Sequence, residues 1–132
     1  MFDFSLHMQL NEVSPLVFAY VGDAVYELYI RTMLAKEGNL PVAKLHRAAT
    51  GYVKAAAQSK TVEALLPMLT KEETAVFKRG RNAHSNTAAK NADILDYRRA
   101  TGFEALLGYL YLKKEFDRLE ELLRLSFSMH NL

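Results

Sequence analysis

The sequence predicts an all-α fold in which one compact helical domain contains the whole chain. Apolar residues recur at the three- and four-residue spacing of helices almost throughout, and no segment shows the alternation that is typical of a strand. The length of 132 residues fits a single domain. Half of the residues are apolar, and prolines and glycines are few, so we expect a well-formed core rather than a disordered chain.

The first predicted helix begins at Ser14 and Pro15. Serine is favoured at the N-cap, and proline is favoured at the first helical position because its ring fixes φ near the helical value. Apolar residues then continue to Leu34, and Gly38 and Asn39 provide a stop signal. The pattern therefore predicts a long helix over this segment.

A second helix is predicted from Pro41 to Leu66. Pro67 prevents further extension, because proline lacks a backbone N–H and disfavours the helical conformation in the residue before it. Gly51 lies inside this segment, and we expect the helix to be kinked near it.

Three more helices are predicted in the second half of the chain. The sequence TKEE at residues 70–73 is a capping box, which opens a short helix that ends near Gly80. Residues 80–91 are polar and rich in turn-forming residues, so they are predicted to form a flexible basic loop. A long helix is expected over residues 93–114, and an amphipathic helix over residues 115–127.

The composition excludes several classes of protein. The absence of cysteine excludes a disulfide framework, a thiolate zinc site and a cysteine nucleophile. No segment reaches the about 20 apolar residues of a membrane span, and the N-terminus lacks the basic region of a signal peptide. These features predict a cytoplasmic protein with no membrane partner.

The positive charge of the chain is concentrated in one segment. The formal net charge is only +2, but residues 78–99 hold six basic and two acidic residues. Cations and backbone N–H groups in such a segment can hold phosphates. The alternative interpretation is that these cations only form a solvated surface.

Each of the two most apolar helices carries an acid in the middle of its apolar stretch, Asp23 in VGDAVYELYI and Glu104 in GFEALLGYLYL. A helix without a polar face is normally buried at the centre of a fold, and a buried carboxylate is rarely left unpaired. Glycines at positions 22, 102 and 108 stand near these acids. A glycine within a helix costs about 1 kcal/mol relative to alanine, and a common reason to tolerate it is close contact between two helices.

Two carboxylates on adjacent helices would repel each other unless an arginine, a shared proton or a divalent cation lay between them. Carboxylate oxygens and water are the ligands that Mg²⁺ and Mn²⁺ prefer. Together with the basic segment, a metal site would favour phosphodiester hydrolysis. Alternatively, the two acids only fix how the helices pack.

Both helices resemble a known family. Residues 16–27 (LVFAYVGDAVYE) are similar to the signature helix of the ribonuclease III catalytic domain, and residues 101–112 (TGFEALLGYLYL) to its second metal-binding helix. The chain resembles from end to end the short subfamily called Mini-ribonuclease III, including the segment RGRNA at residues 79–83.

The resemblance implies a homodimeric endoribonuclease that cuts double-stranded RNA, with Asp23 and Glu104 as the catalytic residues that bind Mg²⁺, or Mn²⁺ in its place. Residues 1–132 would form one catalytic domain without a double-stranded-RNA-binding domain. The products would carry 5′-phosphate and 3′-hydroxyl ends. The subfamily implies maturation of precursor 23S ribosomal RNA, with a ribosomal protein as a further candidate partner. The expected RNA-binding residues are Lys78, Arg79, Arg81, Asn82 and Lys90.

The sequence departs from the family at three acidic positions, where it has Leu16, Ala19 and Thr101. Candidate substitutes for the missing acids are Glu27, Glu63, Asp93 and Asp96, although Glu27 is better placed to pair with Arg31. The departures support an alternative function, a noncatalytic helical module that binds RNA or a ribosomal protein and has a degenerate metal site. His84 is interpreted as a loop residue that is either solvated or in contact with phosphate.

Overall fold

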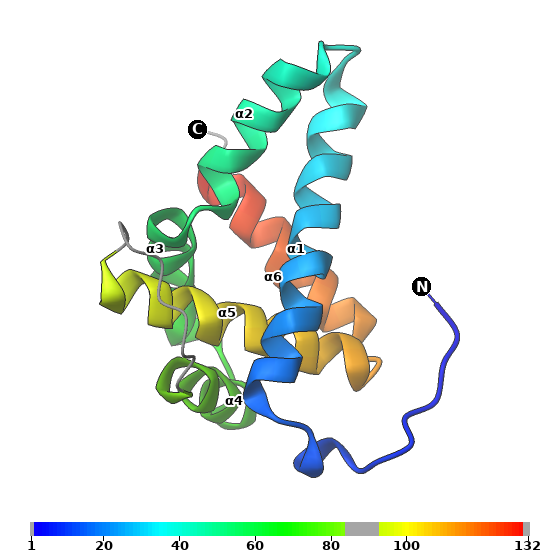
Figure 1. Cartoon of the computed structure of the whole chain (residues 1–132), viewed down its shortest axis with the longest axis vertical. Coiled ribbons are helices and arrows are strands. Elements are labelled where there is room, and N and C mark those ends of the chain that lie inside the picture. The colour runs from blue at the N-terminus through cyan, green and yellow to red at the C-terminus, as the bar shows by residue number, and fades with distance from the viewer. Residues whose placement is uncertain (1, 84–92, 131–132) are drawn as a thin grey trace.

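The structure is a computed structural model and describes residues 2–83 and 93–130. Within these residues it confirms the all-α prediction, with six α-helices and two short 3-10 helices (Figure 1). In chain order the elements are η1 (Leu10–Glu12), α1 (Pro15–Glu37), α2 (Val42–Val53), α3 (Ala55–Leu65), η2 (Leu66–Met68), α4 (Lys71–Asn82), α5 (Ile94–Leu112) and α6 (Phe116–His130). None of the described helices is long and apolar enough to cross a lipid bilayer.

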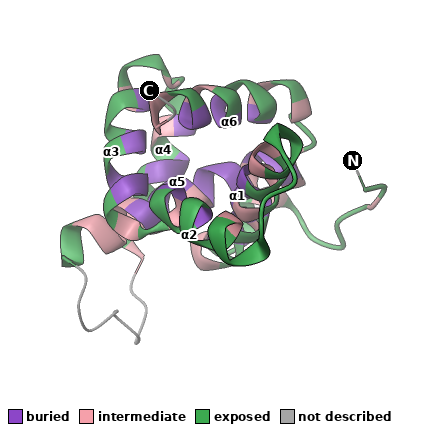
Figure 2. Ribbon diagram, turned by 90° about the horizontal axis from the view of Figure 1, so that it is seen from above, coloured by how far each residue is buried: buried purple, intermediate pink, exposed green. Residues whose placement is uncertain are grey.

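Helix α5 is the centre of the fold. It packs against α1, α3, α4 and α6, and its residues Phe103, Leu106 and Leu107 are fully buried. Figure 2 shows that the buried parts of the surrounding helices face this centre. The ring of Phe103 meets Tyr26 of α1 edge to face, with 5.2 Å between the ring centroids. Helix α1 continues past the core and forms a hairpin with α2, which projects from the rest of the domain (Figure 1).

Two helix starts follow the capping signals in the sequence. Ser14 caps α1 by accepting a hydrogen bond from the backbone N–H of Leu16, and Pro15 is the first helical residue. Thr70 and Glu73 form the predicted capping box of α4, in which each side chain accepts from the other residue's backbone N–H.

Glu73 also joins two helices. It is 5% exposed, and its carboxylate accepts from both Nε and Nη2 of Arg118 in α6, at 2.9 and 2.8 Å. The neighbouring guanidinium lowers the pKa of Glu73, so the acid remains charged in this position. The pair therefore links α4 to α6.

The predicted kink near Gly51 is wrong in position and in kind. Gly51 is an ordinary residue of α2, and the chain breaks three residues later, at Lys54, which has an extended conformation. The break lets α2 follow α1 while α3 turns to pack against α5. Tertiary packing therefore decides where this segment bends, because Tyr52 at the end of α2 is buried against Phe127.

The predicted end of α4 is also wrong. The helix continues through Gly80 to Asn82, so the first residues of the predicted basic loop are helical. Gly80 serves helix packing instead of helix termination, because a Cβ at this position would lie 2.6 Å from the Cβ of Ala105. Residues 84–91 of the predicted loop, including His84 and Lys90, lie outside the described residues.

The expectation that α1 is buried on every side is wrong for one face. Val17, Tyr20 and Leu28 are 49%, 81% and 51% exposed. These residues recur at helical spacing, so they form one continuous apolar strip along α1. We refer to Val17, Tyr20 and Leu28 as the α1 apolar face. No other described element of the chain covers it.

Candidate active site

The crossing of α1 and α5 determines the position of the predicted acids. The two backbones touch, because a Cβ at Gly22 would lie 2.6 Å from the carbonyl carbon of Glu104 and 2.8 Å from the amide nitrogen of Gly108. A Cβ at Gly108 would lie 2.9 Å from the amide nitrogen of Gly22. This contact confirms the interpretation of the glycines as sites of close helix approach. It also places the residue after Gly22, which is Asp23, at the same crossing as Glu104.

The two carboxyl groups interact directly. Burial, repulsion by the Asp23 carboxylate and a hydrogen bond to it raise the pKa of Glu104 to about 8, while a hydrogen bond from Gln58 opposes the shift. In the absence of a cation, Glu104 therefore holds a proton at neutral pH. A cation bound between the two groups would take the place of this proton and would be stabilised by both carboxylates.

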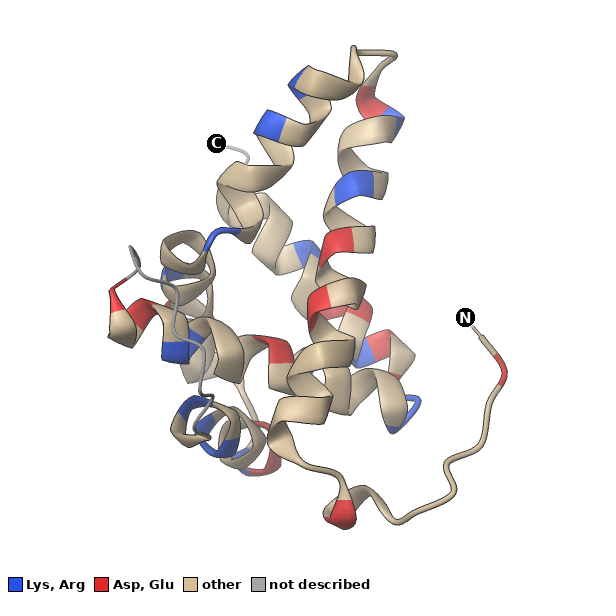
Figure 3. Ribbon diagram, viewed as in Figure 1, with Lys and Arg blue, Asp and Glu red and all other residues tan. Residues whose placement is uncertain are grey.

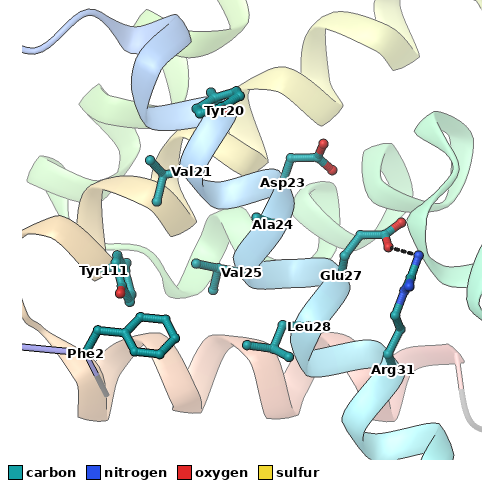
Figure 4. A pocket seen from close by; sticks show the side chains of 10 residues that line it. All are labelled: Phe2, Tyr20, Val21, Asp23, Ala24, Val25, Glu27, Leu28, Arg31 and Tyr111. Atoms are coloured by element: carbon teal, nitrogen blue, oxygen red, sulfur yellow. Dashed lines mark ion pairs between the residues drawn. The ribbon is translucent and has the colours of Figure 1, made fainter.

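Asp23 was expected to lie among apolar neighbours, and the structure corrects this expectation. Asp23 is exposed and Glu104 is half-buried. In Figure 4 the carboxylates of Asp23 and Glu27 project from the same side of α1, away from Phe2 and Tyr111. The reason is that α1 has a narrow polar side. Although most of the helix surface is apolar, this side holds Asp23 and Glu27 and faces the solvent.

The described residues bring no third acid to this pair. No group of three or more histidine, aspartate or glutamate residues suitable for a metal ion occurs in the described part of the chain. Glu27 pairs with Arg31 at 2.8 Å, as the spacing predicted. Asp93 caps α5 by accepting from the backbone N–H of Leu95 at 2.8 Å, and Glu63 is exposed on α3.

Gln58 is a residue at this site that the sequence did not indicate. It lies on α3, is 2% exposed, and its Nε2 approaches Oε2 of Glu104 at 3.4 Å. It stands in the alanine-rich segment AAAQSK, where nothing local distinguishes it from a solvated glutamine.

The donor set fits a divalent cation that keeps part of its water shell. Asp23 and Glu104 provide carboxylate oxygens, and the amide nitrogen of Gln58 approaches the Glu104 carboxylate. Mg²⁺ is commonly bound by one or two carboxylates and retains several waters, so two protein ligands suffice for it. A structural zinc site, by contrast, would need four protein ligands.

The predicted cations of α4 lie on different sides of the helix. Lys78 and Arg79 are exposed, whereas Arg81 is half-buried, with its guanidinium 5.7 Å from the ring centre of Phe77 and its Nε donating to Asn82. Arg79 and Arg81 are two residues apart, which places them about 200° apart around the helix. Around the helix, Lys78 and Asn82 lie between these two arginines, and Asn82 is as near to Arg79 as Lys78 is to Arg81, about 60° in each case.

Acidic residues lie at the helix crossing, and basic residues lie on the neighbouring helices. Figure 3 shows acidic segments of α1 and α5 close to where the two helices cross, and Lys and Arg segments along α2 and α4. A polyanion that reached the acid pair would thus pass basic side chains on the neighbouring helices. This arrangement is that expected of a site that acts on a phosphate backbone.

A hollow of about 740 Å³ lies beside Asp23 on α1 (Figure 4). Its walls are largely apolar and include Tyr20, Leu28 and, from the N-terminal segment, Phe2. The N-terminal segment is held in place because Phe4 stacks on Tyr111 with 5.5 Å between ring centroids. The α1 apolar face therefore borders the acid pair.

Known proteins resemble the chain over most of its length. The Ribonuclease III domain family matches residues 16–115. The chain is 52% identical to Mini-ribonuclease 3 of Clostridium tetani, over 92% of this chain and 81% of the relative. It is 54% identical to Mini-ribonuclease 3 of Enterococcus faecalis, over 86% of this chain and 87% of the relative. Its fold is similar to that of a Fusobacterium nucleatum protein known from its crystal structure, with a TM-score of 0.82, 26% identity, and coverage of 90% and 95% of the two chains.

Proposed function

Because this chain belongs to the ribonuclease III family and resembles Mini-ribonuclease 3 over most of its length, it is an endoribonuclease, and we propose that Asp23 and Glu104 form its metal-binding active site. The family generally uses Mg²⁺, and we assign Mg²⁺ to this acid pair, with Mn²⁺ as a substitute. The observation that carries the assignment is the backbone contact of α1 with α5 at Gly22, which brings Asp23 and Glu104 together at one helix crossing, where Asp23 helps to raise the pKa of Glu104. Such a pair favours a cation between its members.

Each acid has a distinct part in this proposal. Asp23 is exposed at the edge of the hollow beside α1, so its carboxylate is within reach of a bound RNA strand. Glu104 is half-buried and fixed by the backbone contact at Gly22, so it anchors the inner side of the site. Mg²⁺ bound there would activate a water to attack a phosphodiester and would stabilise the leaving oxygen. The products would carry 5′-phosphate and 3′-hydroxyl ends.

We propose that the enzyme acts as a homodimer joined through the α1 apolar face. The exposure of this apolar face to water is unfavourable: Tyr20 is 81% exposed, and Val17 and Leu28 are about half exposed. A second copy of the chain would cover it. Since Asp23 borders the same hollow, dimerisation would place two acid pairs near one interface. Two sites suit a duplex, because each can cut one strand.

We propose that Lys78, Arg81 and Asn82 hold the phosphate backbone of the RNA, together with Lys90, which lies outside the described residues. Arg79, which is next to Asn82 around α4 and farthest from Arg81, is assigned to a second contact. Duplex RNA is recognised mainly through its shape, its 2′-hydroxyl groups and its phosphates, which suits a surface of cations without a base-reading element. The proposed biological substrate is the precursor of 23S ribosomal RNA in the cytoplasm, presented with or without a ribosomal protein.

The experiment that tests the site is cleavage of an end-labelled RNA duplex by the wild type, Asp23→Asn and Glu104→Gln, with Mg²⁺ or with EDTA. We expect discrete Mg²⁺-dependent products from the wild type and a loss of at least 100-fold in both variants, with RNA binding retained. Asp117→Asn, which removes an exposed acid of α6, is the matched control and should cut normally. Wild-type rates for Asp23→Asn would overturn the assignment of this acid.

A further inference from the structure

We infer that Gln58 is a positioning residue of the active site, where its uncharged amide orients Glu104 and stands in for a third acid. The inference rests on the proposed function, because it assigns a role toward the cation that Asp23 and Glu104 would hold. It begins from three observations: the burial of Gln58, its two donated contacts, and an unpaired oxygen on the same amide.

The amide of Gln58 connects two helices through its nitrogen. Its Nε2 donates to the backbone oxygen of Val53 at 2.7 Å and lies 3.4 Å from Oε2 of Glu104. Val53 is the last residue of α2, where the break at Lys54 leaves carbonyl oxygens without helical partners. The side chain of Gln58 therefore satisfies the end of α2, and this bond fixes the second N–H of the amide toward the Glu104 carboxylate.

The oxygen of the same amide is left unpaired. Oε1 of Gln58 is fully buried and has no hydrogen-bond partner among the described residues. An unsatisfied buried polar atom destabilises the folded state, and an apolar side chain in this position would carry no such atom. A buried unpaired acceptor on the side chain that contacts Glu104 is explained if a donor that the protein itself does not provide occupies the site.

A water in the shell of a divalent cation is such a donor. Mg²⁺ keeps several of its waters when bound by only one or two carboxylates, and these waters donate hydrogen bonds to nearby oxygens. Groups that receive such bonds typically change metal affinity by 10–100-fold when they are removed. An amide serves here without adding to the repulsion between Asp23 and Glu104, because it carries no charge.

The test compares the full-length wild type with Gln58→Leu and Gln58→Glu by two measurements. The first is the Mg²⁺ concentration that gives half-maximal cleavage of an RNA duplex. The second is the shift in melting temperature caused by Mn²⁺ without RNA, which does not depend on catalysis. For Gln58→Leu we expect an approximately tenfold higher Mg²⁺ requirement and a smaller Mn²⁺ shift. The metal-free melting temperature should fall, because the backbone oxygen of Val53 loses its donor.

Gln58→Glu adds a negative charge at the position where Gln58→Leu removes the polar group. A third carboxylate should lower the metal-free melting temperature through repulsion, enlarge the Mn²⁺ shift and lower the Mg²⁺ requirement. Thr61→Val is the matched control, because Thr61 is also buried on α3 but bonds to Ala57 and His130, away from the acid pair. It should alter the melting temperature and leave the Mg²⁺ requirement unchanged.

Either Gln58 variant can overturn the inference. A Gln58→Leu protein that melts lower but keeps the wild-type Mg²⁺ requirement and Mn²⁺ shift would show that Gln58 only stabilises the fold. If Gln58→Leu does not fold, an unchanged Mn²⁺ shift in Gln58→Glu has the same meaning. The proposed function fails separately, by Mg²⁺-independent cleavage or by an active Asp23→Asn variant.

Discussion

Gly22 lies against the backbone of Glu104 so closely that a Cβ on Gly22 would be 2.6 Å from the carbonyl carbon of Glu104 and would overlap its carbonyl oxygen. The glycine precedes one proposed metal ligand, and the backbone it touches belongs to the other. The separation of the two acids is therefore set by a contact between two helix backbones, which cannot relax as a contact between flexible side chains would.

The first prediction concerns this contact. Gly22→Ala should destabilise the protein by about 3 kcal/mol or more, because overfilling a packed interface typically costs about 1–3 kcal/mol and here the obstacle is backbone. It should also weaken cleavage beyond the loss of folded protein, since α1 and α5 must move apart. The measurements are chemical denaturation and cleavage rates well below the melting temperature.

Gly51→Ala is the control for the first prediction. Gly51 lies inside α2, and a Cβ there would meet nothing within 4 Å. Alanine favours a helix over glycine by about 1 kcal/mol, so this variant should be slightly more stable than the wild type. Equal effects of the two substitutions would show that the backbone contact at Gly22 is not tight in solution.

The second prediction is a loss of stability of the metal-free protein as the pH rises. Glu104 has its pKa raised to about 8 by burial and by the neighbouring Asp23, whereas in the unfolded chain its pKa is the ordinary value of 4.5. Between these values the folded protein binds more protons than the unfolded one, so the free energy of unfolding decreases with pH. This contribution is fully present below pH 4.5 and is lost by about pH 8.

Denaturation in EDTA across this range should show a decrease on the order of 2 kcal/mol, since each pKa unit corresponds to about 1.4 kcal/mol and the site is partly exposed. Glu104→Gln should remove most of this slope and be more stable than the wild type at pH 8, although inactive. Mg²⁺ should restore stability to the wild type at high pH. A slope that persists in Glu104→Gln would have to come from another group.

Much of the fold could be predicted because its signals are local. Ser14 with Pro15, and Thr70 with Glu73, each satisfy the N–H groups of the helix they begin, so neighbouring residues determine these starts. The crossing of α1 and α5 was also predictable, because a glycine within a helix is unfavourable unless it allows close packing against another helix. The acid pair followed from the same two helices.

The features that could not be predicted depend on distant parts of the chain. Gln58 reaches Glu104 across 46 positions of sequence, and no local pattern encodes that contact. The break at Lys54 is set by what α2 and α3 each pack against. The α1 apolar face cannot be distinguished from core in the sequence, because periodicity shows that a face is apolar but does not show whether the same chain or another molecule covers it.

The third prediction concerns the cations at the end of α4. Replacing Lys78 and Arg81 together by glutamine should weaken RNA binding and reduce the slope of log affinity against log salt by about 1.4–1.8, if each cation contacts one phosphate. The melting temperature should fall only slightly, because Lys78 is exposed and Arg81 loses only its contact with the ring of Phe77. Arg124→Gln on α6, where the side chain is also exposed, is the control and should keep the wild-type slope. An unchanged slope in the double variant would place the RNA elsewhere.

The fourth prediction concerns the α1 apolar face. Placing a charge there should prevent two copies from associating, because lysine cannot be buried in an apolar contact without a partner for its charge. Tyr20→Lys and Leu28→Lys should therefore shift the protein from dimer to monomer in analytical ultracentrifugation, while circular dichroism shows the helical content unchanged. Val42→Lys is the control, because Val42 is 80% exposed like Tyr20 but lies on α2, outside this face. It should remain dimeric.

Cleavage of both strands of a duplex at one position should become uncoupled in the monomeric variants, because each monomer would carry a single acid pair. A wild type that sediments as a monomer at all concentrations would contradict the proposed dimer directly.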